Sequence, residues 1–178
     1  MRFNRSFLFY YCLATFTCLS WMLPTASADR VTDWLEKNGV ERGICVLLGD
    51  PSGKAAIDLA QDSDLLVYTQ LQTGEQAASA RKAAKTAGLD ATQIQITQGD
   101  LTRLHLADNL ANAVIILGSH LTTPKAEVLR VLSPRGKATF GTRELTKPVP
   151  PGVDDWPHPY HGPDNNPLSN DTTITAPY

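Results

Sequence analysis

Cysteine, aromatic residues and an excess of one charge are all scarce in this sequence. Of its 178 residues three are Cys and 7% are aromatic, while 16 basic residues stand against 18 acidic ones. A net charge of −2 with 42% apolar residues excludes a disordered chain, a collagen-like chain and a strongly nucleic-acid-binding protein. Only Cys45 lies beyond residue 28. The later part therefore has no disulfide framework and depends on aliphatic packing.

The first 28 residues have the layout of a secretory signal peptide. Arg2 and Arg5 precede an apolar stretch from Phe7 to Leu23, and the small residues Ala26-Ser27-Ala28 follow it. We predict cleavage after residue 28, export to the periplasm or beyond, and no stable membrane span after cleavage. The alternative is a transmembrane anchor, which is disfavoured because polar residues dilute a run that is already short for a membrane span.

Residues 29–147 alternate β-branched runs with Ala-rich stretches, which is the pattern of an α/β domain. We expect a Rossmann-like, mostly parallel sheet of about five strands with flanking helices. The expected strands are residues 44–48, 65–69, 94–97, 113–117 and 137–140. The expected helices are one around residue 34, then 54–60, 74–87 and 124–132. No strand candidate follows Phe140, so we expect an open sheet edge that needs a partner.

Residues 148–178 form a different region, because eight Pro occur in about thirty residues. No packed element fits such a composition, so we predict a Pro-rich linker or extended arm. Trp156, Tyr160 and Tyr178 are apolar contact groups within it. We therefore expect another domain to follow.

Four segments resemble class I S-adenosylmethionine-dependent methyltransferases. They are Gly49-Asp50-Pro51-Ser52-Gly53, Gly99-Asp100, Leu104-His105-Leu106-Ala107-Asp108-Asn109 and Glu127-Val128-Leu129-Arg130-Val131-Leu132-Ser133-Pro134-Arg135-Gly136. The resemblance covers roughly residues 40 to 142 and implies S-adenosylmethionine as the cofactor. The positions that it implies for cofactor binding are Gly49, Asp50, Ser52, Gly53, Gln70, Asp100 and Leu101.

The departures from the family pattern fall at the cofactor positions. Leu47 stands where an acidic residue is usual, and Pro51 replaces the middle glycine and removes an N–H donor. Leu71 takes the place of the carboxylate that would hold the ribose, although the neighbouring Gln70 offers a weaker, uncharged hydrogen bond. Asp100 alone keeps a usual polar contact, to the adenine edge. These losses argue against tight cofactor binding, as does export away from the cytoplasm.

The arm contains a second resemblance, over residues 154–166. This segment, with Trp156 followed by His158 and a polar turn, is similar to the start of exported β-propeller proteins related to pyrroloquinoline-quinone-dependent dehydrogenases. The resemblance implies that a propeller domain follows and that this chain is part of a longer protein. No propeller repeat is present here, so no quinone ligand is assigned to any residue. The alternative is a flexible tail with incidental aromatic residues.

Three functional hypotheses follow from these observations. The first is an exported methyltransferase-like domain that lacks methyl transfer and acts as an interaction or scaffold module docked on a propeller domain or another protein surface. The second is an active methyltransferase of unknown acceptor, with Gly49, Gly53 and Asp100 holding the cofactor. The third is a binding domain for another nucleoside or a quinone-type ligand, held by Asp50, Ser52 and Asp100.

Other motifs carry less chemistry. Ser119-His120 follows the fourth expected strand, but no Gly-x-Ser-x-Gly elbow surrounds it, which disfavours a hydrolase. His158 and His161 are spaced like metal ligands, yet a Pro-rich arm is a poor frame for a metal, and no metal is expected. Asn170-Asp171-Thr172 matches a glycosylation acceptor, a triplet that is frequent by chance.

Overall fold

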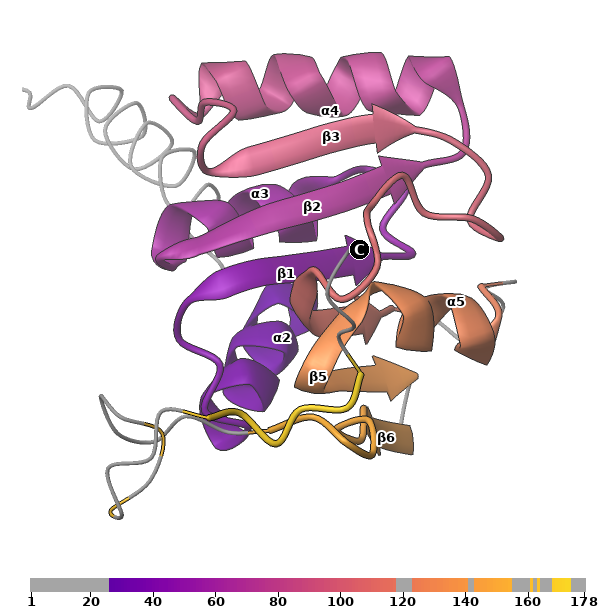
Figure 1. Cartoon of the computed structure of the whole chain (residues 1–178). Helices are drawn as coiled ribbons and strands as arrows, with labels where there is room; N and C mark the ends of the chain where they lie inside the picture. The colour runs from indigo at the N-terminus through magenta and orange to yellow at the C-terminus, as the bar shows by residue number, and fades with distance from the viewer. Residues whose placement is uncertain are drawn as a thin grey trace, which may run out of the picture.

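The computed structural model describes residues 26–117, 123–140, 143–154, 161, 163 and 168–173. Helices and strands alternate from α2 to β3, and one more helix, α5, separates β4 from β5 (Figure 1), which confirms the predicted α/β class. The helices are α2 (Ala26–Lys37), α3 (Lys54–Asp62), α4 (Gly74–Thr86) and α5 (Lys125–Val131). The strands are β1 (Gly43–Leu48), β2 (Leu65–Leu71), β3 (Ile94–Gln98), β4 (Ala111–Ile116), β5 (Leu132–Phe140) and β6 (Arg143–Thr146).

The strands form one sheet in the order β3-β2-β1-β4-β5-β6. All neighbouring pairs from β3 to β5 are parallel, and β6 is antiparallel to β5. The chain builds outward from β1 to β3 and then returns to place β4 on the other side of β1. The carboxyl ends of β1 and β4 therefore meet at the point where the strand order reverses, which is where open α/β sheets bind ligands.

The sixth strand corrects the expectation that no strand follows Phe140. Strand β6 pairs with β5, with Arg143 opposite Phe140 and Thr146 opposite Lys137. Leu145 is the single apolar residue of β6 and is half-buried, so the segment has almost no hydrophobic pattern. Its backbone hydrogen bonds to β5 define it instead. The edge predicted to be open at β5 is thus covered, and β6 is the outer strand there.

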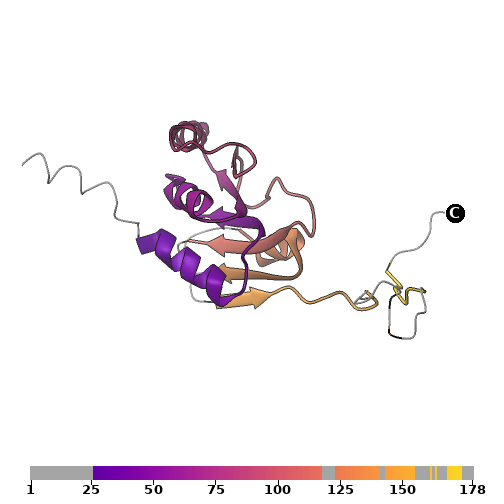
Figure 2. The same ribbon diagram turned by 90° about the vertical axis from the view of Figure 1, so that its left-hand side faces the viewer.

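Each face of the sheet has its own apolar core. Helices α2, α3 and α4 cover one face, and α5 with the segment 99–110 covers the other (Figure 2). Strand β1 shows how one strand serves both cores, because successive side chains point to opposite faces. Cys45 and Leu47 are buried under α2 and α3, while Val46 and Leu48 are buried on the α5 side. A strand buried on both faces is continuous in its apolar residues.

Helix α4 has clear sequence signals at both ends. The Thr73 hydroxyl accepts a hydrogen bond from the Gln76 N–H, and the Gln76 side chain accepts one from the Thr73 N–H, which forms a capping box. Gly88, with φ +80°, follows the last turn, as predicted from the sequence. The buried side of α4 consists of Ala77, Ala80 and Ala84, whose small side chains let the helix lie close to the sheet and to α3.

Helix α2 begins at Ala26, so the predicted cleavage after residue 28 falls within its first turn. Val31 and Leu35 pack into the core on the α2 side of the sheet. Within the described ranges, no helix is long and apolar enough to cross a membrane. Export and cleavage remain predictions.

The described part of the Pro-rich arm turns back on itself. The Thr172 N–H donates a hydrogen bond of 2.8 Å to the Gly152 carbonyl oxygen. The Asp154 carboxylate gathers three further groups, since its Oδ2 accepts from the Asn170 N–H at 2.6 Å and the Ser169 hydroxyl at 3.2 Å and lies 2.6 Å from His161 Nε2. These bonds join two parts of the arm that are far apart in sequence.

Candidate functional site at the switch point

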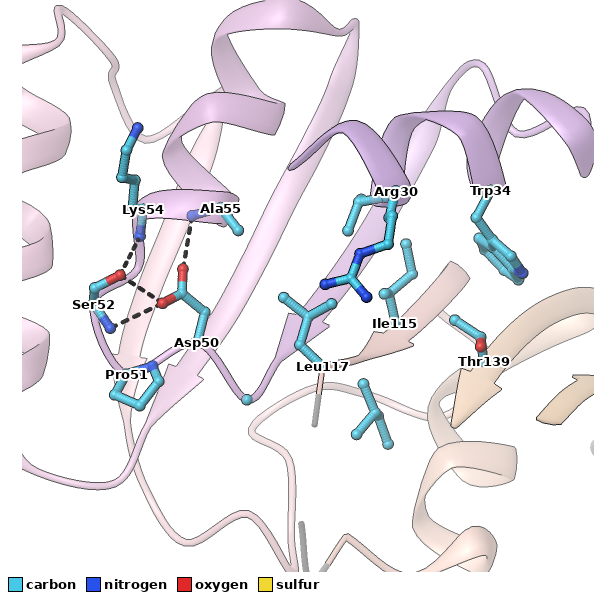
Figure 3. A pocket seen from close by; sticks show the side chains of 13 residues that line it. Arg30, Trp34, Asp50, Pro51, Ser52, Lys54, Ala55, Ile115, Leu117 and Thr139 are labelled. Atoms are coloured by element: carbon cyan, nitrogen blue, oxygen red, sulfur yellow. Dashed lines mark hydrogen bonds between the residues drawn. The ribbon is translucent and has the colours of Figure 1, made fainter. Parts of the chain in front are cut away.

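A cavity of about 470 Å³ lies at the point where the strand order reverses (Figure 3). Its walls come from α2, from the loop between β1 and α3, and from the carboxyl ends of β4 and β5. The lining residues are Arg30, Val31, Trp34, Gly49, Asp50, Pro51, Ser52, Lys54, Ala55, Ile115, Ile116, Leu117 and Thr139. The volume is within the usual range of about 300–1,000 Å³ for small-molecule sites.

The Asp50 carboxylate is bound to the loop that would hold a cofactor. Its Oδ1 accepts hydrogen bonds from the Ser52 N–H at 3.0 Å and the Ser52 hydroxyl at 2.6 Å. Its Oδ2 accepts from the Ala55 N–H at 2.7 Å, in the first turn of α3 (Figure 3). The start of a helix attracts negative charge because its first N–H groups and its dipole both point outward. In this chain the Asp50 carboxylate supplies that negative charge.

Gly53 has a packing role in the same loop. Its φ of +69° is the left-handed region, which glycine adopts without strain. A Cβ atom at this position would stand 2.8 Å from the Ala80 Cβ of α4. The loop therefore turns close against α4 only because residue 53 has no side chain. Its N–H donates to the Asp50 carbonyl oxygen at 3.1 Å, which closes the turn through Pro51.

Gln70 is the central residue of a buried polar network. Its Nε2 donates to the carbonyl oxygens of Asp100 at 2.7 Å and Arg103 at 2.9 Å. Its Oε1 accepts from the Tyr68 hydroxyl at 2.7 Å and the His105 N–H at 3.0 Å. Only 1% of Gln70 is exposed. Both amide hydrogens and both lone pairs are thus engaged with the protein, and a ribose hydroxyl would have to displace one of these partners.

The predicted site residues do not all converge on the cavity. The structure places Gly49, Asp50 and Ser52 in its lining and Gly53 in the adjoining turn. The other three predicted residues, which are Gln70, Asp100 and Leu101, lie outside the lining. Asp100 is exposed, and its Oδ1 accepts from the Thr102 N–H at 2.9 Å, while Leu101 is buried in the core on the α5 side.

Most of the 13 lining residues were not predicted from the sequence as site residues, and three of these bring polar or aromatic groups to the cavity. Arg30 and Trp34 extend from α2 toward the strand ends, and Thr139 comes from β5 (Figure 3). The Trp34 Nε1 donates to Glu144 Oε1 at 3.0 Å, and this bond ties α2 to β6. The sequence predicts a helix around residue 34, but it contains no signal that this helix lies over the switch point.

The segment from Glu127 to Gly136, which carries much of the family resemblance, has charged residues with a structural role. The Arg130 guanidinium donates to both carboxylate oxygens of Glu127, at 2.6 and 2.9 Å, and to the carbonyl oxygens of Leu104 and Leu106. The Leu104 N–H donates to Glu127 Oε1 at 2.7 Å. The hydrogen bonds from Arg130 hold the pKa of Glu127 below its usual range, although burial acts in the opposite direction. This ion pair fixes the segment between β3 and β4 onto α5.

The other chemical motifs contribute little to a site. Ser119-His120 and His158 lie outside the described residues. Across the described part of the chain, no three His, Cys, Asp or Glu side chains gather as metal ligands would. His161 instead lies against Asp154 in the arm.

Of the comparisons with known proteins, only the one with solved structures found matches. No protein-family model matches the sequence, and no curated protein matches it significantly. A candidate S-adenosyl-L-methionine-dependent methyltransferase from Methanococcus maripaludis matches the structure with a TM-score of 0.57 and 26% identity, over 63% of this chain and 53% of that one. A candidate sarcosine dimethylglycine methyltransferase from Galdieria sulphuraria has a TM-score of 0.57 and 23% identity, over 63% and 44%.

A third match is the [4+2]-cyclase SpnF, with a TM-score of 0.54 and 26% identity, over 62% of this chain and 43% of that one. This chain therefore spans about half the length of the solved structures that it matches. Together these matches show an α/β fold of the S-adenosylmethionine-dependent methyltransferase type, with six strands in the order 3-2-1-4-5-6. The same fold is also found in a protein named for a reaction other than methyl transfer.

Proposed function

We propose that this chain is a methyltransferase-like domain without methyl transfer, which serves as an interaction or scaffold module next to a quinoprotein-like propeller in an exported protein. The main support for the absence of methyl transfer is the Asp50 carboxylate, which accepts hydrogen bonds from the N–H groups of Ser52 and Ala55. A cofactor carboxylate placed at this helix start would meet a like charge and would find these donors already occupied.

Two further positions support this proposal. Leu71, which stands where the ribose-binding carboxylate is expected, is 3% exposed and packs in the core on the α2 side. The neighbouring Gln70 already makes four hydrogen bonds within the protein. The residues present therefore do not fit S-adenosylmethionine well, and we assign no catalytic residue.

A second function is favoured by the cavity itself. It keeps about 470 Å³ at the switch point and combines the cationic Arg30 with the aromatic Trp34 and the aliphatic Ile115. Such a mixture suits a small ligand with a flat apolar body and an acidic group. The alternative use of this site is therefore a quinone-type ligand that carries a carboxylate, bound beside Arg30 and Trp34 instead of by Asp50, Ser52 and Asp100.

The test of cofactor binding is thermal unfolding of the purified protein with and without millimolar S-adenosylmethionine. A ligand at one hundred times its Kd adds about 2.7 kcal/mol of stability, so binding would be easily seen. We expect no shift for the natural sequence. We expect a shift for Asp50→Ala, which frees the donors of Ser52 and Ala55, and none for Asp62→Ala, which removes an exposed carboxylate at the other end of α3.

A clear shift for the natural sequence, or transfer of a labelled methyl group to any acceptor, would contradict the proposal. The scaffold role has its own test, which is the size of the native protein in its source. We expect an immunoblot against this domain to detect an exported protein far longer than 178 residues. A native species of this length alone would remove the propeller from the proposal.

A further inference from the structure

The Pro-rich arm is folded back on itself by a small set of polar contacts outside the candidate site. After β6 the chain runs through residues 148–154 and extends beyond the sheet (Figure 2). The Thr172 N–H then donates to the Gly152 carbonyl oxygen at 2.8 Å, so two distant parts of the arm lie side by side. The residues that make these contacts form a hook, which consists of Gly152, Asp154, His161, Ser169, Asn170 and Thr172.

Three groups of the hook converge on a single carboxylate oxygen. Asp154 Oδ2 accepts from the Asn170 N–H at 2.6 Å and from the Ser169 hydroxyl at 3.2 Å. The same oxygen lies 2.6 Å from His161 Nε2, and the side chains of Asp154 and His161 are 17% and 14% exposed. Hydrogen bonds to a charged acceptor are roughly twice as strong as those between neutral groups. The charged Asp154 carboxylate is therefore the central group of the hook.

Gly152 is a second, independent requirement of the same arrangement. Its φ is +84°, the left-handed region that glycine adopts without strain. A Cβ atom at this position would overlap the Thr172 hydroxyl oxygen and would stand 3.6 Å from the Thr172 Cβ. The Thr172 N–H reaches the Gly152 carbonyl oxygen because residue 152 has no side chain. A glycine and, two positions later, a carboxylate thus support one folded form of the arm.

The contacts of the hook favour the charged form of Asp154. The hydrogen bond from the Asn170 N–H holds the pKa of the Asp154 carboxyl below its usual range, although burial acts in the opposite direction. The Ser169 hydroxyl and His161 lower this pKa further. Contacts that lower a pKa are weakened when the group is protonated. We therefore expect the hook to open when acid protonates Asp154.

Other titratable groups lie in the same arm. A neutral histidine can still donate from Nε2, so the charge of Asp154 matters more to the hook than the charge of His161. Asp171 accepts hydrogen bonds from the N–H and hydroxyl of Thr173, within its own turn. Three more titratable residues of the arm lie outside the described residues, and these are Asp155, His158 and Asp164.

We propose that Asp154 is a clasp that sets the reach of the arm. While its carboxylate is charged, the hook is closed and residue 172 lies beside residue 152. Without that charge the hook opens, and the 20 positions between these residues span at most about 70 Å when fully extended. The clasp does not depend on the loss of methyl transfer, because no residue of the hook lines the cavity at the switch point. Its use as a variable spacer rests on the proposed role of this domain beside a second one.

The experiment is hydrogen exchange of the purified protein, measured at the Thr172 amide, which donates to Gly152 and not to a titrating group. We expect this amide to be protected at pH 7. Asp154→Ala should lower its protection by about tenfold or more, because three partners lose their charged acceptor. Gly152→Ala should cause a similar loss without removing any charge. The matched control is Asp155→Ala, which removes the neighbouring carboxylate and should leave the protection unchanged.

The pH dependence of the same amide tests the role of the charge. After correction for the intrinsic exchange rate, its protection should fall as pH drops through the lowered pKa that Asp154 has in the closed hook. Asp154→Asn keeps an acceptor oxygen but cannot be charged, so it should be less protected at pH 7 and show no such fall. The amides of β1 serve as the internal standard for an intact domain.

A distance measurement tests the reach itself. Spin labels are placed on Val149→Cys and Thr173→Cys, while Cys45 is buried and should stay unlabelled. We expect one short distance at pH 7, and a longer, broader distribution when Asp154→Ala is added. An unprotected Thr172 amide in the natural sequence, protection or distances unchanged in Asp154→Ala, or an equal loss in Asp155→Ala would overturn the proposal. None of these outcomes bears on cofactor binding or on the length of the native protein, which test the proposed function separately.

Discussion

Arg130 forms ion pairs with Glu127 and Asp108. Replacing Arg130 with methionine should destabilise the domain more than replacing either of these two carboxylates. Methionine keeps much of the apolar stem but removes every donor of the guanidinium. The Glu127 carboxylate is 7% exposed and would lose its hydrogen-bonded partner, with only the more distant Arg103 left at 3.6 Å, while the carbonyl oxygens of Leu104 and Leu106 would lose their donor. Breaking a buried ion pair by removing one partner costs about 3–5 kcal/mol. We expect Arg130→Met to cost at least about 3 kcal/mol, measured by urea unfolding.

Two variants of the same network calibrate that figure. Glu127→Gln keeps an oxygen that can accept from the Leu104 N–H, so we expect it to cost about 1–3 kcal/mol. Asp108→Asn removes an outer partner of Arg130 whose side chain is 67% exposed, and an exposed pair contributes about 1 kcal/mol or less. The double variant Glu127→Gln with Arg130→Met should cost less than the sum of its parts, because the uncompensated charge is absent.

The pH dependence of stability tests the Glu127–Arg130 ion pair in a second way. The pKa of Glu127 is lowered in the folded protein, chiefly by its hydrogen bonds from Arg130. Glu127 therefore contributes to the free energy of unfolding at pH values above the pKa that its carboxyl group has in the unfolded chain. This contribution is lost as pH falls through its pKa in the folded protein. The difference in stability between the natural sequence and Arg130→Met should be full at neutral pH and shrink in acid. A cost below about 1 kcal/mol at pH 7, or a cost that grows in acid, would refute the reasoning.

Two further predictions concern the core. Gly53→Ala should cost more stability in urea unfolding than Gly39→Ala by about 1–3 kcal/mol, because both have positive φ but only the Cβ at residue 53 would meet Ala80, at 2.8 Å. Equal losses of stability in the two variants would show that the contact with Ala80 of α4 does not add to the cost at residue 53. Burial raises the pKa of the Cys45 thiol to about 12, so peptide mapping should find Cys45 unlabelled by a thiol reagent at about pH 9 in the native protein and labelled in denaturant.

Most of the fold was predictable because its signals are local. Strand β1 is a continuous apolar run that ends at Gly49, and α4 has a capping Thr73 at its start and Gly88 after its end. Strand β6 gave no such signal, because an exposed edge strand is held by backbone hydrogen bonds and Leu145 is its one apolar residue. The sequence reports side chains, so an element that depends on the backbone is easily missed.

The position of the candidate loop in the fold was predictable from the sequence, but the contacts of its side chains were not. The loop after β1 was located correctly, since parallel strands place such loops at the ligand-binding edge. The direction of the Asp50 carboxylate depends on the turn through Pro51 and Gly53, which only the folded backbone defines. Three of the four hydrogen-bond partners of Gln70 lie 30 to 35 positions away in sequence, so they depend on how the segment after β3 packs.

The hydrogen bond between Gly152 and Thr172 has a consequence for how this region tolerates change. It brings together two residues that are 20 positions apart and thereby closes a loop of the chain. The entropy of closing such a loop grows slowly, by about 0.6 kcal/mol for each doubling of its length. A change in the number of residues between Asp154 and Ser169 therefore adds little to the free energy of closing the loop between Gly152 and Thr172.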